Sequence, residues 1–222
     1  MSNLVLSSQS VAEEFVNWAI NLRSNEIPKV VTNKLKLVLL DSFGLMIATR
    51  NQNYIKSLIN SCTESGKCIA VGHKKTLSPF DAITVNGTAI HGEDFDDTFE
   101  GTPVHIGSVI IPSILATSQY FNLRGNEIIS GIVVGTELIC RLALVSPTAI
   151  HKQGFHPTAI LGALGASIAI SKAIGNNKNQ SVSALGIVGS MTSGIIEYLA
   201  EGTWTKRLHP GWAGACGWKS SL

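Results

Sequence analysis

The chain has 222 residues, which is enough for one large domain with a sizeable core or for two small domains. Hydrophobic residues make up 45% of it, charged residues only 14%, and the mean hydropathy is +0.25, so we expect some apolar surface to meet a partner. The net charge of +2 is too small to indicate nucleic acid or an anionic membrane as a partner, and the sequence has no basic stripe with interleaved aromatic residues.

Cysteine usage indicates a reducing environment. No CxxC pair and no metal-site spacing occurs among the four cysteines, Cys62, Cys68, Cys140 and Cys216. With no signal peptide, this pattern predicts free thiols and a cytoplasmic protein. The most membrane-like run, residues 128–145, contains Glu137 and Arg141, which would pair in a soluble helix but would be costly in lipid. We therefore predict no membrane span.

Helical periodicity dominates the first quarter of the chain. Residues 10–23 form an amphipathic pattern with Ser10 as the N-cap, and a second helix is predicted from about 28 to 49. Residues 37–48 of that helix are apolar nearly all round. We expect this segment, together with the apolar segment 158–170, to be among the most buried parts of the fold.

The rest of the chain continues the helical pattern, with turn signals between the segments. The short run CIAVG at 68–72 is a strand candidate, but one isolated run does not make a sheet. No repeat and no linker divides the chain, so the sequence predicts a single all-α domain over residues 1–222. Helices are predicted at residues 53–64, 79–98, 106–121, 126–145, 157–173 and 180–198. Close helix contacts are expected at Gly131, Gly135, Gly162, Gly165, Gly186 and Gly189.

A dense acidic cluster lies in the stretch from His91 to His105, HGEDFDDTFEGTPVH, between two apolar segments. Its acids are Glu93, Asp94, Asp96, Asp97 and Glu100. Like-charge repulsion and desolvation make such a cluster costly, and acids at the C-terminal end of a helix oppose its dipole. A functional site is therefore favoured over a solvated loop. If the helix continues to residue 98, His91, Asp94 and Thr98 share one face.

The run DFDDT by itself fits three unrelated patterns. The D-x-D-x-T loop of haloacid-dehalogenase-like enzymes needs a hydrophobic strand before it, and TAIHGE is not one. The acid motif of class II terpene cyclases belongs in aromatic-rich pockets, whereas aromatic residues are 6% of this chain. An EF-hand calcium loop would need a glycine and a terminal glutamate that are missing here. The terpene cyclase remains as an alternative.

Three separated motifs together are more specific. NGTAIHGEDFDDTFEGTPVHIGSVIIPS, GFHPTAILGALGAS and WTKRLHPGWA resemble the MmgE/PrpD family, in the same order and over essentially the whole chain. That family includes 2-methylcitrate dehydratase, cis-aconitate decarboxylase and iminodisuccinate epimerase. The resemblance implies a large all-helical domain, a di- or tricarboxylate substrate, and no metal or organic cofactor.

The resemblance also implies that part of the enzyme is missing from this chain. Family members carry a smaller α/β lid, which would be absent here, because the chain stops at Leu222 within a helix that follows Pro210. We therefore expect a helical domain that is incomplete at its C-terminus. A homodimer and a separately encoded lid domain are the protein partners that the resemblance suggests.

The family's functional positions can be carried onto this sequence residue by residue. The catalytic positions fall on Asp94, Thr98, His105, His156 and Lys206, and substrate-binding positions on His91, Arg207 and His209. Histidine suits a general base or acid because its ordinary pKa lies near neutral pH. Asp94 would hold a histidine in the right tautomer, Lys206 would neutralise substrate charge, and Thr98 would donate a hydrogen bond.

These roles imply proton removal next to a carboxylate, followed by loss of water, loss of carbon dioxide, or reprotonation. Dehydration, decarboxylation and epimerisation stay open, and so does a catalytically inactive helical module that has lost its lid. The catalytic residues should converge on one cleft that is open where the lid would close. Because five acids would repel an anionic substrate, some must point away or pair with Lys206, Arg207 or His105.

Overall fold

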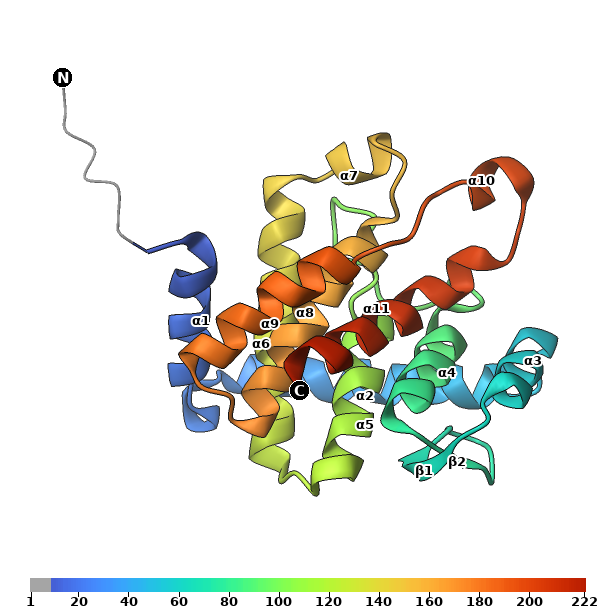
Figure 1. Ribbon diagram of the computed structural model, residues 1–222, viewed down its shortest axis with the longest axis horizontal. Helices are drawn as coiled ribbons and strands as arrows, with labels where there is room; N and C mark the ends of the chain where they lie inside the picture. Colours follow the sequence, from blue (N-terminus) through green and yellow to red (C-terminus); the bar gives the residue numbers. More distant parts are fainter. Residues whose placement is uncertain (1–8) are drawn as a thin grey trace.

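The computed structural model describes residues 9–222, so the first eight residues of the predicted domain lie outside it. The described residues are predominantly helical, which confirms the all-α prediction (Figure 1). The elements are α1 (Val11–Asn21), the 3-10 helix η1 (Ser24–Glu26), α2 (Lys29–Thr49), α3 (Asn53–Ser61), β1 (Ser65–Ile69), β2 (Thr76–Leu77), α4 (Pro79–His91), α5 (Gly107–Phe121), α6 (Gly125–Val145), α7 (Ala149–Lys152), α8 (Pro157–Ile174), α9 (Lys178–Met191), α10 (Tyr198–Glu201) and α11 (Thr205–Ser221).

Helix α8 is the centre of the fold. It packs against α6, α11, α5 and α9, and most of its residues are buried, as predicted for 158–170 (Figure 1). Its contact with α6 is close because both helices carry glycine there: a Cβ on Gly165 would overlap the side chain of Ile139. A Cβ on Gly135 would lie 2.8 Å from the carbonyl oxygen of Gly165. The predicted close helix contacts are wrong for Gly186 and Gly189, where an added Cβ would have no neighbouring atom within 4 Å.

The predicted burial of residues 37–48 is wrong. Leu37 is 61% exposed and Leu40 is 71% exposed, while Ser42 and Met46 are buried. Helix α2 packs against α4 and α5 along one side only, at the periphery of the helical core. A helix that is apolar all round can be covered on one side by its own chain and leave the other side for a partner, and the hydrophobic pattern does not distinguish this from full burial.

The predicted helix 79–98 is also wrong in its second half. Helix α4 ends at His91, and Asp94 has φ +60°, a left-handed conformation that breaks the helix. The repulsion among the acids and their unfavourable position at a helix C-terminus favour this ending. The following loop runs to Ile106 with no helix, so His91, Asp94 and Thr98 do not share a helix face.

Two shorter elements differ from the sequence prediction. The helix predicted at 180–198 ends at Met191, and a separate short helix, α10, follows it. The strand candidate at 68–72 is shifted to Ser65–Ile69 and pairs antiparallel with β2, contrary to the expectation that it would form no sheet. Its partner, Thr76–Leu77, is two residues long, too short to give a periodic signal of its own.

Two helices within residues 9–222, α6 and α8, are long and apolar enough to cross a membrane. For α8, 78% of the apolar window is buried inside the protein, as in the core helix of a soluble protein. Helix α6 carries the predicted ion pair, with Arg141 Nη2 at 2.5 Å from Glu137 Oε1. The four cysteines form no disulfide in the described chain, and burial raises the pKa of Cys68 and Cys216 to about 11.

Candidate active site

A cleft of about 390 Å³ opens where the end of α4, the loop after it, the start of α8, α10 and the start of α11 meet. It reaches solvent, since the side chain of Asp94 is 59% exposed. The fold therefore brings four of the predicted catalytic residues onto one cleft from distant parts of the sequence. The residues that line it include Asp94, His105, His156, Tyr198, Lys206 and Arg207.

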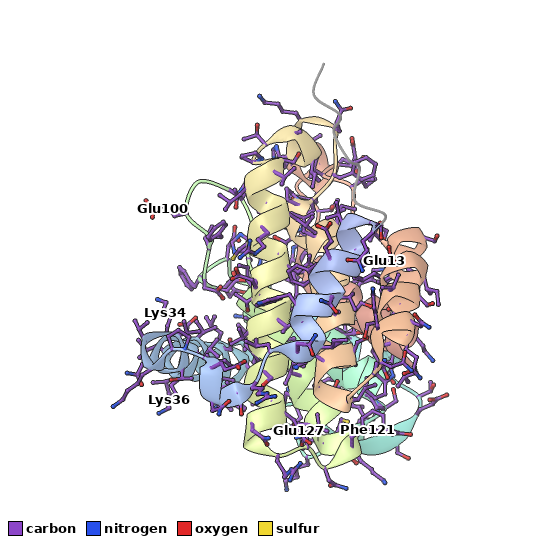
Figure 2. The ribbon with its side chains drawn as sticks, turned by 90° about the vertical axis from the view of Figure 1, so that its left-hand side faces the viewer. Glu13, Lys34, Lys36, Glu100, Phe121 and Glu127 are labelled. Carbon is purple, nitrogen blue, oxygen red and sulfur yellow. The ribbon has the colours of Figure 1, made fainter. Side chains whose placement is uncertain are left out.

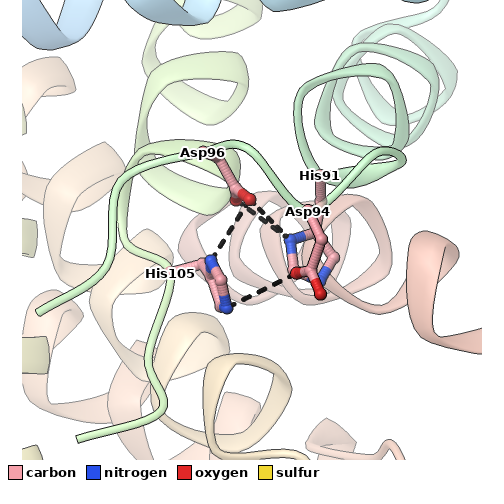
Figure 3. A group of neighbouring side chains, drawn as sticks. All are labelled: His91, Asp94, Asp96 and His105. Carbon is pink, nitrogen blue, oxygen red and sulfur yellow. Dashed lines mark hydrogen bonds and ion pairs between the residues drawn. The ribbon is translucent and has the colours of Figure 1, made fainter.

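Asp96 holds two histidines at the base of the cleft (Figure 3). Its Oδ2 lies 2.9 Å from Nδ1 of His91 and its Oδ1 lies 3.2 Å from Nδ1 of His105. The side chains of Asp96 and His91 are fully buried. Burial would raise the pKa of Asp96, but the hydrogen bonds and charges of His105 and His91 outweigh it, and the pKa is lowered. Asp96 is therefore an ionised, buried acceptor shared by two imidazoles.

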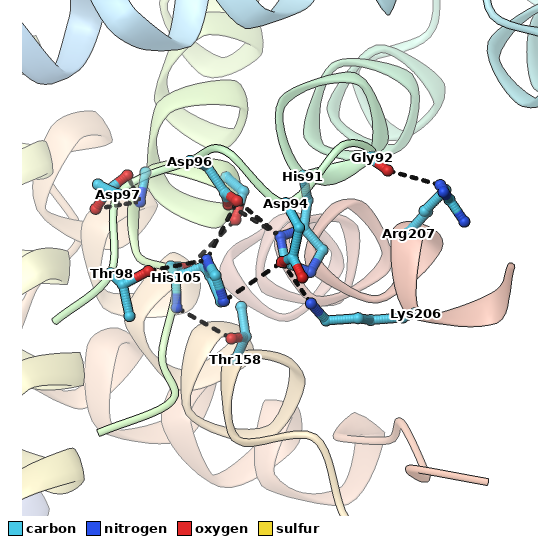
Figure 4. A network of polar contacts seen from close by, with 12 residues as sticks. His91, Gly92, Asp94, Asp96, Asp97, Thr98, His105, Thr158, Lys206 and Arg207 are labelled. Atoms are coloured by element: carbon cyan, nitrogen blue, oxygen red, sulfur yellow. Dashed lines mark hydrogen bonds and ion pairs between the residues drawn. The ribbon is translucent and has the colours of Figure 1, made fainter. Parts of the chain in front are cut away.

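Asp94 is paired most closely with Lys206 and more distantly with the ring of His105. Lys206 Nζ donates to Asp94 Oδ1 at 2.5 Å, whereas His105 Nε2 lies 3.8 Å from the same oxygen. Burial acts to raise the pKa of Asp94, and the hydrogen bond and charge of Lys206 reverse this and lower it. Asp96 lies closer to the histidine rings than Asp94 does, and the expected role of Asp94 in orienting a histidine stays a prediction. The left-handed turn points Asp94 outward to α11, and Asp96 points inward to the rings (Figure 4).

His156 and His209 form a buried histidine pair. Their Nδ1 atoms lie 3.1 Å apart, and the ring of Tyr198 packs against both, at 5.9 Å from His156 and 5.7 Å from His209. Burial, helped by the neighbouring histidines, lowers the pKa of His156 to about 2, and burial with the charge of His91 lowers that of His209 to about 4. His156 lines the cleft. His209, predicted to bind substrate, lies behind His156, outside the set of lining residues.

Arg207 lies at the rim of the cleft, held by aromatic rings and one backbone oxygen. Its guanidinium lies 4.6 Å from the ring centroid of Trp204 and 5.3 Å from that of Tyr54. Its Nε donates to the carbonyl oxygen of Gly92 at 2.6 Å. This stacking fixes the direction of the guanidinium and connects α11 to the end of α4.

Thr98 and His91 are placed less directly than predicted. Thr98 is exposed and faces a second, mostly apolar cavity across the loop from the cleft, with its Oγ1 3.5 Å from Nδ1 of His105. The ring of His91 is buried against that of His156, with centroids 5.6 Å apart and an interplanar angle of 28°. The sequence predicts Thr98 as a catalytic residue that donates a hydrogen bond, but its side chain does not line the cleft. The sequence also predicts that His91 binds substrate, but the side chain of His91 is buried.

The structure also shows how the acids coexist around the site. Glu93 accepts a hydrogen bond from Tyr54 Oη at 2.8 Å, and Asp97 accepts the backbone N–H of Gly107 at 3.0 Å. Glu100 lies at the turn in the middle of the loop and points away from the helices (Figure 2). Asp94 pairs with Lys206 and Glu100 points away, as predicted for some of the acids. Repulsion between Asp96 and Asp97 remains, because burial and then the charge of Asp96 raise the pKa of Asp97.

Four side chains of the site form a donor set that a divalent cation could use. Ligand atoms of His91, Asp94, Asp96 and His105 all lie within 4.8 Å of one another. A cation would have to replace the Lys206 ammonium at Asp94 and the imidazole protons at Asp96. The predicted independence from metal ions stays a prediction.

Sequence reasoning missed three residues that shape the site. Asp96 lay within the DFDDT run, but its role depends on which way the loop turns. Tyr198 lay outside all three motifs. Thr158 belongs to the second motif, and its Oγ1 accepts the backbone N–H of His105 at 3.1 Å, which connects the loop to the start of α8.

Comparison with known proteins shows which family the chain resembles. The family model of the MmgE/PrpD N-terminal domain matches residues 13–222. The chain is 25% identical over 217 residues to the cis-aconitate decarboxylase of Aspergillus terreus, covering 93% of this chain and 44% of that protein. It is 29% identical to the cis-aconitate decarboxylase of Mus musculus over 229 residues, covering 96% and 45%.

The match to the cis-aconitate decarboxylase of Homo sapiens is similar, with 28% identity over 212 residues, 91% of this chain and 44% of the human protein. The chain thus spans less than half the length of the curated relatives that it matches. The family model covers nearly all of the chain, and the predominantly helical fold is consistent with it. The chain therefore belongs to the MmgE/PrpD family, of which it carries the N-terminal domain.

Proposed function

We propose that this chain supplies the helical part of an active site that moves a proton at a carbon next to a carboxylate of a di- or tricarboxylic acid. The observation that carries the proposal is one cleft that holds imidazoles and two cations, Lys206 and Arg207. Four histidines line it, and we assign the proton transfer to two of them, His105 and His156. Two imidazoles can give and take protons on a bound carbon acid, and the cations can neutralise its carboxylates.

Lys206 is the group that we assign to the developing charge. Removing a proton, or carbon dioxide, next to a carboxylate leaves an electron pair that spreads onto carboxylate oxygens as an enediolate. An ammonium beside those oxygens stabilises the enediolate more than the neutral carbon acid, so it lowers the barrier. In the free site this ammonium is held by Asp94, and a substrate carboxylate would compete with Asp94 for it.

Decarboxylation is the reaction that we place first, because the curated relatives are named cis-aconitate decarboxylases. In that reaction the bond to one carboxylate breaks, carbon dioxide leaves, and an imidazole N–H protonates the remaining carbanion. Dehydration would use one imidazole to take the proton and another to protonate the departing hydroxide. Epimerisation would return a proton to the opposite face. The alternative from a different class is an inactive helical module.

The test is turnover of cis-aconitate, 2-methylcitrate and iminodisuccinate in D₂O, followed by proton NMR, with the 222-residue chain alone and with a lid domain co-expressed. We expect little turnover from the chain alone, because the open cleft does not exclude water. With a lid, we expect turnover or deuterium exchange of one of these acids.

Two variants connect that activity to the cleft. His156→Gln and Lys206→Met should each lower the rate on the order of 10²-fold or more, as for positioned acid–base and charge-stabilising groups. Val11→Ala is the control, since Val11 is 81% exposed at the start of α1, which packs on the far side of α8. Equal rates for all three variants would refute the site. No exchange on any of the acids, with or without a lid, would favour the inactive module.

A further inference from the structure

We propose that Asp96 is a positioning residue that keeps the proton of His105 on Nδ1, so that Nε2 of His105 is the proton acceptor facing the cleft. The catalytic consequence rests on the proposed function, but the tautomer is a property of the chain itself and can be measured without a substrate. The inference starts from one buried carboxylate between two imidazole Nδ1 atoms, at 2.9 Å from His91 and 3.2 Å from His105.

The number of protons around Asp96 decides the tautomers. Its side chain is fully buried, and an ionised carboxylate can only accept hydrogen bonds. A buried charge without donors is strongly unfavourable, and the side-chain donors that the described chain offers to Asp96 are the two Nδ1 atoms. Both Nδ1 atoms therefore carry hydrogen. A neutral imidazole has one N–H, so both Nε2 atoms carry a lone pair.

The two histidines differ in what their Nε2 atoms can reach. Nε2 of His91 is buried and has no hydrogen-bond partner within the part of the chain that the structure describes. Burial also lowers the pKa of His91, which keeps the ring neutral. His91 therefore shares the carboxylate without taking part in proton transfer. Its own ring, stacked on that of His156, forms the wall behind the site.

His105 can act where His91 cannot. Its side chain is 13% exposed and lines the cleft. Its Nε2 lies 3.8 Å from Asp94 Oδ1, the oxygen that holds the Lys206 ammonium, so the lone pair faces the place where a substrate carboxylate would meet Lys206. When Nε2 takes a proton, the buried carboxylate of Asp96 stabilises the imidazolium through Nδ1–H.

The other side chains that could orient the ring of His105 make longer contacts with it than Asp96 does. The Thr98 hydroxyl lies 3.5 Å from Nδ1, longer than the 3.2 Å contact with Asp96. Asp94 is 59% exposed and already paired with Lys206. Asp96 could instead serve only to attach the loop to α4 through His91, in which case the tautomer of His105 would be independent of it. The experiment has to separate these two roles.

The measurement is long-range ¹H–¹⁵N correlation NMR of the ¹⁵N-histidine-labelled chain at pH 7.5, which distinguishes Nδ1–H from Nε2–H imidazoles. Signals are assigned with His91→Gln and His105→Gln. We expect both rings as the Nδ1–H tautomer, although free histidine prefers Nε2–H. A proton on Nε2 of His105 in the unmodified chain would overturn the inference, and this readout needs no destabilising substitution.

Asp96→Asn then tests the cause. The carboxamide oxygen can accept from one Nδ1–H, while its NH₂ group must donate to the other ring, so at least one of the two rings should change to Nε2–H. Asp97→Asn is the matched control: its side-chain oxygen can still accept the N–H of Gly107, and both tautomers should persist. Unchanged tautomers in a folded Asp96→Asn chain would contradict the proposal.

The rate separates this inference from the proposed function. In an active, lid-supplemented form, Asp96→Asn should lower kcat by about 10²- to 10⁴-fold with little change in KM, as expected when a catalytic histidine is held in the wrong tautomer. A loss confined to KM would overturn the positioning role. If the unmodified chain shows the expected tautomers and turns over none of the acids, the tautomer assignment stands and the proposed function fails.

Discussion

At the scale of single residues, the site combines a buried neutral layer with an exposed charged one. His91, His156 and His209 are buried and have lowered pKa values, while Lys206 and Asp94 form an ion pair at the solvent side. Burying imidazoles keeps them neutral, and of these three it is His156 that we propose to exchange protons with a substrate in the cleft. Their neutrality also has a cost in stability at low pH.

The pH dependence of stability follows from these shifts. His156 has a pKa of about 2 in the folded chain against an ordinary value of 6.5, so between these values the unfolded chain binds more protons. The contribution of neutral His156 to the free energy of unfolding is therefore fully present above about pH 6.5 and is lost as the pH decreases. At pH 5 the loss from His156 alone is about 2 kcal/mol, since each pH unit is worth about 1.4 kcal/mol per proton. His209 and His91 act in the same direction.

The measurement is the urea midpoint at several pH values between 7.5 and 5 for the unmodified chain and for His156→Asn. The free energy of unfolding of the variant should decrease less steeply with falling pH, by the slope that corresponds to about one bound proton, whatever its absolute stability. Asp96, whose pKa is lowered, adds a further loss only when the pH falls through the acid range below about 4. Parallel curves for the two chains would contradict the buried neutral state of His156.

At the scale of elements, the contact between α6 and α8 supports the site from behind. Helix α8 begins at Pro157, directly after His156, so its position fixes where that imidazole enters the cleft. The close approach of the two helices at Gly135 and Gly165 leaves no room for a side chain. Glycine lowers the helix propensity at these two positions, but it allows the two helices to pack closely.

We expect Gly165→Ala to destabilise the fold by about 1–3 kcal/mol, because its Cβ would overlap Ile139 in a well-packed core. Gly186→Ala on α9 is the control: it has no atom within 4 Å of the new Cβ and should gain up to about 1 kcal/mol from helix propensity. Both are read from thermal or urea unfolding followed by circular dichroism. A neutral Gly165→Ala would show that the helices can separate at no cost.

At the scale of the whole molecule, the exposed apolar face of α2 is unlike an ordinary protein surface. Val30, Leu37 and Leu40 are 74%, 61% and 71% exposed. Val30 also lines an apolar cavity of about 390 Å³, together with Leu35 and Phe99. Large apolar side chains exposed to this degree are typical of interaction sites, although Lys34 and Lys36 are also exposed on this helix. We propose that a second copy of the chain covers it, in agreement with the homodimer expected from the sequence.

Light scattering at micromolar concentration should give about twice the chain mass of 23.6 kDa. The double variant Leu37→Lys with Leu40→Lys should give a monomer, because two charges on one side of α2 would be desolvated in the interface. Val11→Lys, a similar change at a residue that is 81% exposed on α1, should leave the dimer intact. A monomeric unmodified chain would assign the α2 face to another partner.

The sequence by itself determined the helical class, most helix positions and the burial of α8, because these depend on local propensity and on the hydrophobicity of one segment. It also picked out the motifs that supply Asp94, His105, His156 and Lys206. The exposed side of α2 could not be predicted, because an all-round apolar helix has the same pattern whether its own chain or a partner covers it.

Only the tertiary structure decided which acid does what. Asp94 and Asp96 are two residues apart in one acidic run, and by sequence alone either could orient a histidine. The left-handed turn at Asp94 sends that side chain to Lys206, 112 positions along the chain, and turns Asp96 inward to His91 and His105. The direction of a side chain in a loop depends on one backbone angle and on partners far away in the sequence, and the hydrophobic and charge pattern of the surrounding residues predicts neither.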